Sequence, residues 1–317
     1  MDVLSDMVAA ARLGRPHSSR NYKRPPWGTR FEPFAGAGFH VVLRGSCWLI
    51  PTRGDAVALA VGDVLFLPHG RGHGLADSPA TPLTCARAEP LAATENGRER
   101  VPVTARSEGS RPGDETILLC GGYLLDRSRP NPLLDELPDP IHLPARTGDR
   151  RSLHATVGLL GSELDRPLPG SAAVVPALLD AMLLYILRAW IDEQAGQHPV
   201  TGWAAALSDP AILAALSVIH DDPARPWTVQ ALAKHAALSR AAFARRFTAT
   251  VGQAPIAYLT WWRMTMAARS LRETDAPIAA IANEIGYTSQ FAFANAFKRA
   301  LGTAPGRYRR VRPTGCS

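Results

Sequence analysis

Cysteine is scarce in this chain and is nowhere clustered. The 317 residues contain four cysteines, and no two of them form a Cys-x-x-Cys pair. This spacing gives no support to a disulfide framework. We therefore expect free thiols, as in a protein of the reducing cytoplasm.

A long uninterrupted apolar run is also missing. The N-terminus begins with acidic residues and lacks the apolar core of a signal peptide. The most apolar stretch, residues 172–190, contains Pro176, Asp180 and Arg188, so a buried or interface helix explains it better than a membrane span. We therefore expect a cytoplasmic protein with no membrane partner.

The first two thirds of the chain have no net positive charge. From Pro210 to the end there are 14 Lys and Arg against 5 Asp and Glu, a net charge of +9, whereas residues 1–209 have 21 against 23. A polyanion that docks on the C-terminal third would gain from counterion release. With 46% apolar residues and this length, the chain is globular and long enough for two domains and a connection.

The C-terminal third repeats itself at a fixed spacing. Five residues recur at an offset of 50, which indicates a duplicated unit. They are Ser239, Phe243, Phe247, Gly252 and Pro255, repeated as Ser289, Phe293, Phe297, Gly302 and Pro305. Upstream, Leu232-Ala233 recurs as Ile281-Ala282 at an offset of 49. The slip of one residue falls in a turn between helices.

Each copy predicts a helix, a turn and a second helix. In the first copy, residues 229–236 form the first helix, 237–238 the turn, and Ser239 the N-cap of the second. Phe243 and Phe247 share one face, which is buried on the first helix. The opposite face presents Arg240, Ala241, Ala244 and Arg245, and can enter a major groove.

The second copy has the same plan. Residues 278–285 form its first helix, 286–288 its turn, and Ser289 caps a helix whose outward residues are Gln290, Phe291, Ala294 and Asn295. An apolar helix over residues 258–271 separates the copies and would hold their two recognition helices about one DNA turn apart. The alternative is an ordinary all-α domain in which the phenylalanines are only core and the arginines only solvated.

This repeat resembles the DNA-binding domain of AraC/XylS transcription regulators over about a third of the chain. The matching positions are Leu238-Ser239-Arg240-x-x-Phe243-x-Arg245-x-Phe247, Gly252-x-x-Pro255-x-x-Tyr258-Leu259-x-x-x-Arg263-Met264, Ile278-x-x-Ile281-Ala282-x-x-Ile285-Gly286-Tyr287-x-Ser289-x-x-x-Phe293, and Phe297-Lys298-x-x-x-Gly302-x-x-Pro305-x-x-Tyr308-Arg309. The resemblance implies a transcription regulator that binds double-stranded DNA and works with RNA polymerase. By the same resemblance the DNA-binding residues are Ser239, Arg240, Ala241, Ala244, Arg245, Ser289, Gln290, Phe291, Asn295 and Lys298.

The N-terminal half changes to short apolar runs separated by Gly and Pro. Many short strands predict a barrel or sandwich. The runs cover residues 39–43, 46–50, 56–59, 64–67, 83–85 and 116–120. The segment from Gly62 to Asp77, with Pro68-His69-Gly70 and His73, resembles the second motif of cupin barrels, in which the histidine points inward.

The first cupin motif is incomplete. Gly38 stands where metal-binding cupins have a glutamate, and that motif's two histidines are absent too. His40, on the same strand face, can join His73 inside the barrel. The candidate effector or metal residues are therefore His40, His69, His73 and Cys120. With Cys120 as a soft ligand, the two histidines would suit zinc or a similar metal; satisfied core or pocket histidines are the alternative.

The stretch Leu119-Cys120-Gly-Gly-Tyr123 resembles the cupin-type sensor domains of one AraC branch, some members of which respond to oxidants. Thiol sensing is therefore one hypothesis. An inert buried thiol at Cys120 is the other, because reactivity requires exposure and a lowered pKa.

We expect a multi-domain chain. Residues 1–150 form an all-β cupin-like sensor barrel, 151–206 a helical linker, and 207–317 an all-α domain with two helix-turn-helix units. The linker helices, 152–163 and 174–193, pack on the barrel or join two subunits of a homodimer. The resulting hypothesis is a non-enzymatic regulator that senses a small molecule, metal or oxidant. Its rivals are a metal-dependent cupin enzyme fused to a DNA-binding domain, and an architectural DNA-binding protein with an inert barrel.

Overall fold

The chain folds into two compact units, one of sheets and one of helices. The computed structural model describes every residue except 1, 86–114, 127–129, 146–149, 197–200 and 311–317. The helical unit comprises the described residues of Met1–Ala11, Ser128–Glu136 and Ile191–Ser317; the sheet unit comprises those of Arg12–Arg127 and Leu137–Trp190. Neither unit is continuous in sequence, and the division into domains at residues 150 and 206 stays a prediction.

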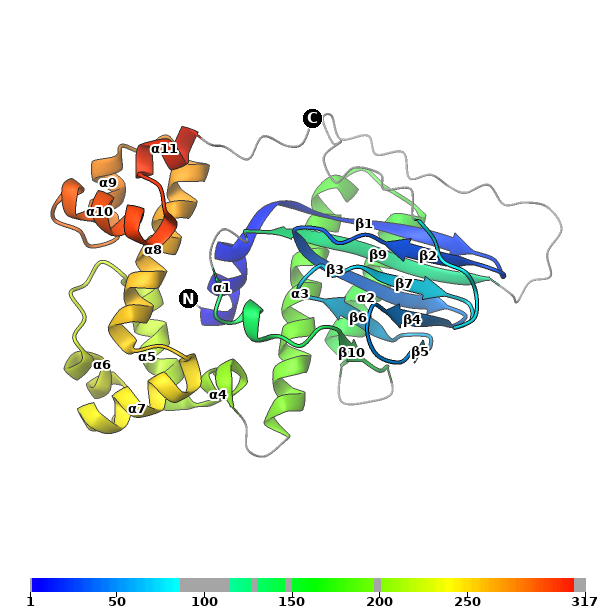
Figure 1. The fold of residues 1–317 in the computed structure, drawn as a ribbon, viewed down its shortest axis with the longest axis horizontal. Coiled ribbons are helices and arrows are strands. Elements are labelled where there is room, and N and C mark those ends of the chain that lie inside the picture. Colours follow the sequence, from blue (N-terminus) through cyan, green and yellow to red (C-terminus); the bar gives the residue numbers. More distant parts are fainter. Residues whose placement is uncertain (1, 86–114, 127–129, 146–149, 197–200, 311–317) are drawn as a thin grey trace. The chain divides into compact units, whose positions relative to one another are not determined.

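The sheet unit contains two five-stranded sheets (Figure 1). Sheet one has the strand order β1-β9-β3-β6-β10, with β1 Arg12–Lys23, β9 Thr116–Leu125, β3 Gly36–Arg44, β6 Val64–Leu67 and β10 Ile141–Leu143. Sheet two has the order β5-β4-β7-β2-β8, with β5 Val57–Leu59, β4 Cys47–Pro51, β7 His73–Ala76, β2 Gly28–Phe31 and β8 Thr84–Cys85. The predicted β-rich cupin fold is confirmed, and among the described residues its strands form two sheets and no closed barrel.

Alternate residues of the strands build a core between the sheets. On β3, His40 lies opposite Cys120 of β9 and Leu65 of β6, so the three side chains share one face of sheet one. Cys120 and Leu65 belong to an apolar cluster with Leu49 and Leu75 of sheet two. The interior is therefore apolar around His40 and His73, the two histidines that the sequence predicts to point inward.

Two helices, α2 Arg151–Asp165 and α3 Ser171–Ala195, belong to this unit except for the last residues of α3. The Tyr123 hydroxyl on β9 donates to the Leu179 carbonyl at 2.6 Å, and Arg20 on β1 donates to the Gly161 carbonyl at 3.1 Å. Both predicted linker helices exist, and these bonds tie them to sheet one. By length and composition α3 could cross a membrane, as could α4 and α5 together as a pair bent by 89°. Residues such as Leu183 are buried, but only 28% of the most apolar part of α3 is buried in the described structure.

The helical unit carries the predicted repeat. Its elements are α1 Val3–Ala11, α4 Gly202–Ser208, α5 Pro210–Asp221, α6 Val229–His235, α7 Arg240–Val251, α8 Pro255–Glu273, α9 Ile278–Glu284, α10 Gln290–Leu301, α11 Pro305–Arg310 and the 3-10 turn Leu134–Glu136. Helix α8 runs between two groups, α4 to α7 at one end and α9 to α11 at the other (Figure 1). The predicted spacer at 258–271 is confirmed and is longer at both ends, beginning with Pro255 in the first turn, where its missing N–H costs nothing.

Both copies use the same turn geometry. The turn between α6 and α7 has Ala237 in the left-handed region, at φ 52°, and the turn between α9 and α10 has Gly286 there, at φ 85°. Helices α7 and α10 both end at a left-handed glycine, Gly252 and Gly302. Because the left-handed residue still recurs at the offset of 49, whereas the serine caps Ser239 and Ser289 recur at 50, the slip detected in the sequence lies after this point, between the left-handed residue and the cap.

Candidate nucleic-acid interface and signal site

Helix α7 presents the predicted outward face of the first copy. The Ser239 hydroxyl accepts a hydrogen bond from the Ala242 amide at 3.2 Å, which caps the helix as the sequence predicted. Phe243 and Phe247 are completely buried. On the other side Arg240, Ala241 and Arg245 are exposed and Ala244 is half-buried. Arg240 and Arg245 are thus two exposed cationic side chains on a capped helix, and an arginine can bind a phosphate or a guanine.

Arg246, next to Arg245, is held by the protein. Its Nε donates to the Asp209 carboxylate at 2.5 Å, and Asp209 also accepts hydrogen bonds from the Ala211 and Ile212 amides as the cap of α5. In the described structure no ion pair holds Arg240 or Arg245. The sequence did not distinguish these arginines, because Asp209 is distant along the chain.

Helix α10 presents a different face. The Ser289 hydroxyl accepts from the Ala292 amide at 3.3 Å, and Phe293 and Phe297 are completely buried. The predicted contact residues Gln290, Phe291, Asn295 and Lys298 are all exposed, and Ala294 is half-buried. The predicted face is therefore brought together here too, with an aromatic ring and amides where α7 has arginines.

In the sheet unit the two predicted interior histidines meet. The Nε2 atoms of His40 and His73 lie 2.7 Å apart, and the ring of Phe31 is stacked on His73 and tilted against His40, with centroids 4.9 and 4.8 Å away. Burial lowers the pKa of both histidines, and for His40 the neighbouring His73 lowers the pKa further. Both rings are therefore neutral near pH 7.

Hydrogen bonding fixes how the protons are arranged on this pair. His73 Nδ1 lies 3.1 Å from the Arg71 carbonyl oxygen, which can only accept, so Nδ1 carries the proton and Nε2 is an acceptor. His40 must then donate from Nε2, which leaves its Nδ1 as a bare acceptor. That atom is buried without a hydrogen-bond partner in the described structure. An unsatisfied buried acceptor is costly, and a ligand or water that donates to it would relieve the cost.

The donor set does not fit a metal ion. The described residues contain no group of three or more His, Cys, Asp and Glu side chains that could hold one. The facing His40 and His73 nitrogens are hydrogen-bonded to each other, and Cys120 does not complete a site with them. His69 takes no part, because its Nε2 donates to the Leu137 carbonyl at 2.8 Å. The described structure therefore gives no support to the predicted zinc-type site.

The interior thiols are poor nucleophiles. Burial raises the pKa of Cys47 and of Cys120 to about 12, so almost no thiolate forms at neutral pH. Cys85 is exposed at the end of sheet two. Cys316 lies outside the described residues. Burial thus favours the alternative that Cys120 is an inert interior thiol.

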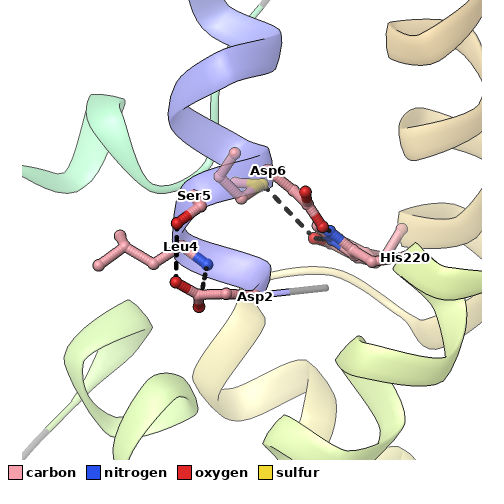
Figure 2. A network of polar contacts seen from close by, with 7 residues as sticks. Asp2, Leu4, Ser5, Asp6 and His220 are labelled. Carbon is pink, nitrogen blue, oxygen red and sulfur yellow. Dashed lines mark hydrogen bonds and ion pairs between the residues drawn. The ribbon is translucent and has the colours of Figure 1, made fainter. Parts of the chain in front are cut away.

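The first helix, α1, is part of the helical unit and packs on α5 and α8. Figure 2 shows Asp6 of α1 beside His220 of α5. The Asp6 carboxylate lies 3.1 Å from His220 Nδ1, and His220 Nε2 lies 2.7 Å from the Tyr258 hydroxyl of α8. The His220 ring is also stacked on Trp262 with centroids 3.9 Å apart. Burial lowers the pKa of His220 even though Asp6 acts in the opposite sense.

A second segment from the N-terminal half, residues 130–136, joins the same unit. The Asn131 amide donates to the Met7 carbonyl at 3.5 Å, Trp261 Nε1 donates to the Pro130 carbonyl at 3.1 Å, and the Glu136 carboxylate accepts from the Trp203 amide at 3.0 Å. Sequence reasoning missed both anchors. The apolar residues at 4, 7, 8 and 11 have helical spacing and would have revealed α1.

Comparison with known proteins agrees with both units. A family model described as Cupin matches residues 2–192, and one described as Helix-turn-helix domain matches residues 232–311. A putative AraC-like transcription regulator of Streptomyces lividans is 36% identical over 98% of this chain and 98% of its own length. The RCS-specific HTH-type transcriptional activator RclR of Escherichia coli is 26% identical over 98% of this chain and 99% of its own length.

Solved structures are also similar to the helical unit. The DNA-binding domain of AdpA, in complex with a target DNA, is 32% identical, covers 34% of this chain and 99% of that chain, and has a TM-score of 0.32. With the cupin match over more than half of the sequence and a full-length relative at 36% identity, the chain belongs to the AraC-like transcription regulators, which bind DNA through a helix-turn-helix domain.

Proposed function

We propose that the sheet unit binds a small-molecule effector and thereby changes how the helical unit holds DNA. The observation that carries the proposal is the placement of α1 and residues 130–136, which flank strands of the sheet unit in sequence but pack inside the helical unit. Residues of the cupin match therefore form part of the DNA-binding unit. A sheet unit with no role in regulation would not require such an arrangement.

We place the effector contact at His40 and His73. The bare Nδ1 of His40 is suited to a ligand that donates one hydrogen bond, and the surrounding leucines and Phe31 are suited to an apolar body. His69 and Cys120 then have supporting roles, His69 in fixing the loop after β6 and Cys120 in lining the interior.

An oxidant is the competing signal. The name of RclR describes that relative as RCS-specific. Thiol oxidation requires a thiolate, and the buried Cys47 and Cys120 form very little of it. These two thiols therefore favour a bound molecule over thiol oxidation as the signal.

The route of coupling follows from the chain connectivity. Helix α1 ends at Ala11 and β1 begins at Arg12, and Arg12 pairs with Leu125 at the end of β9, just before residues 130–136. Both anchors thus leave the same end of one strand pair. If an effector shifts β1 and β9, it would displace both α1 and residues 130–136, and so change how α5 and α8 pack.

We further propose that the protein is not an enzyme, acts in the cytoplasm and contacts RNA polymerase. The names of the relatives, which are transcription regulators, support this. A homodimer is supported by exposed apolar side chains on and between α2 and α3, namely Leu159, Leu168 and Val174.

The test perturbs the sheet interior and reads the response in α1. In His40→Gln, hydrogen–deuterium exchange of residues 3–11 and the Kd for a genomic DNA fragment selected by the same protein are compared with wild type. We expect altered exchange and a change in Kd of about 5-fold or more, the usual scale of coupling between sites. Met7→Ala, which loosens α1, should abolish the effect of His40→Gln on the Kd.

Ala9→Ser, on the exposed side of α1, is the matched control and should leave exchange and Kd unchanged. If His40→Gln alters neither quantity, the two units are not coupled through α1 and the proposal fails.

A further inference from the structure

Phe291 is an aromatic side chain with nothing packed over it. It is the second residue of α10, and at 77% exposure it is the most exposed of the large apolar side chains that the structure describes. Its neighbours Phe293 and Phe297, on the opposite face, are completely buried. The helical periodicity explains the exposure, because it places Phe291 on the face of α10 that points away from the core.

Phe291 begins a stripe along the outward side of α10. Asn295 and Lys298 follow at spacings of four and three, so the three side chains lie above one another, and all are exposed. Residues at the N-terminus of a recognition helix reach base edges, whereas residues further along lie near the backbone. Phe291, Gln290 and Asn295 are thus placed for bases, and Lys298 for a phosphate.

The chemistry of this stripe matches one kind of base pair. The major-groove edge of an A·T pair presents the apolar 5-methyl group of thymine and the donor and acceptor pair N6 and N7 of adenine. An aromatic side chain contacts the methyl, and an Asn or Gln amide pairs with adenine. The stripe of Phe291, Asn295 and Lys298 contains no arginine, the side chain that recognises guanine.

The first copy has the opposite character. At the offset of 50, Phe291 corresponds to Ala241, Gln290 to Arg240 and Asn295 to Arg245. We propose that α10 reads A·T pairs, with Phe291 packed on a thymine methyl and Gln290 or Asn295 on adenine, while α7 reads G·C pairs. The operator then has two halves of different composition. This inference rests on the proposed function as a DNA-binding regulator and on the prediction from the sequence that α7 and α10 carry the base contacts.

The test removes one methyl group at a time. The full chain selects its site from a random-sequence duplex library, and each thymine of the selected duplex is then replaced by deoxyuridine, which lacks only the 5-methyl group. At fixed salt we expect one or two replacements to weaken binding by about 5-fold or more in wild type and to have no effect in Phe291→Ala. Phe291→Leu should retain part of the thymine preference.

Ile256→Ala is the matched control, because Ile256 is an exposed apolar residue outside the recognition helices. The affinity of the Ile256→Ala variant for the selected duplex should fall with the same deoxyuridine replacements that weaken binding by wild type. If Phe291→Ala keeps wild-type affinity for every duplex but loses transcription in a reporter strain, the ring contacts a protein and the inference is overturned. If the chain selects a site but no methyl matters, only this inference fails; if it selects none, the proposed base contacts fail as well.

Discussion

Arg245 and Arg246 are adjacent in α7, yet only Arg246 is held by an ion pair in the described structure. The Asp209 carboxylate that holds Arg246 also caps α5, so Arg246 joins two helices. Arg245 is exposed and its charge is available to a ligand. Substitution of two adjacent arginines therefore separates DNA contact from fold stability.

We predict that Arg245→Ala abolishes specific operator binding and leaves the fold intact. An arginine bidentate to guanine contributes about 1–3 kcal/mol of discrimination, whereas loss of a surface contact costs little stability. Shift assays at matched salt measure the affinity, and circular dichroism the fold. Arg246→Ala is the comparison and should lower the melting temperature more than the specificity. Unchanged affinity in Arg245→Ala would remove it from the interface.

At the scale of elements, the two turns differ in one residue. Ala237 adopts a left-handed conformation that costs an L-residue about 1–2 kcal/mol, whereas its counterpart Gly286 adopts it freely. A Cβ added to Gly286 would also collide with the Ala224 carbonyl. The first copy therefore contains strain that the second avoids.

We predict that Ala237→Gly stabilises the helical unit by about 0.5 kcal/mol, since relief of strain exceeds the added freedom of the unfolded chain. Gly286→Ala should destabilise it by about 2 kcal/mol or more, because a strained backbone and a collision combine. Urea unfolding of the full chain measures both. A loss of stability in Ala237→Gly, as expected for glycine in ordinary helix, would contradict the reasoning.

The elements that the sequence predicted are those with local signals. Helices α7 and α10 have a serine cap, a phenylalanine pair and a terminal glycine, which together determine where each helix begins, ends and faces. Strand β1 was missed because its sequence is polar and contains Pro16, so only pairing with β9 makes it a strand.

The pair of His40 and His73 was predicted from the sequence, because strand alternation places both side chains inward. The His220 network was not predicted, because the three helices that form it are distant from one another in sequence.

At the scale of the whole molecule, each unit contains histidines that are neutral when folded. Burial lowers the pKa of His40, His73 and His220 below the ordinary value near 6.5. The unfolded chain therefore binds more protons below that pH, and the stabilisation present at neutral pH is lost as the pH falls through 6.5.

We predict that the free energy of unfolding falls between about pH 7.5 and about pH 5.5, by up to about 1.4 kcal/mol per pH unit for each histidine that takes up a proton. Urea unfolding across this range measures the slope. His220→Gln keeps a neutral hydrogen-bonding group and should reduce the slope by one proton. A flat profile, or one that rises toward acid, would mean that the buried histidines already carry protons.

The packing of α1 on α8 also determines the order in which the protein can mature on the ribosome. Met7 and Tyr258, which touch through a sulfur–hydroxyl contact of 3.5 Å, are 251 positions apart. At the usual rates of synthesis, about 5–20 residues per second, α1 emerges roughly 10–50 s before its docking surface exists. During that interval its apolar face, with Leu4, Met7 and Val8, has no partner in α8. The nascent chain is therefore a candidate client for a chaperone at α1.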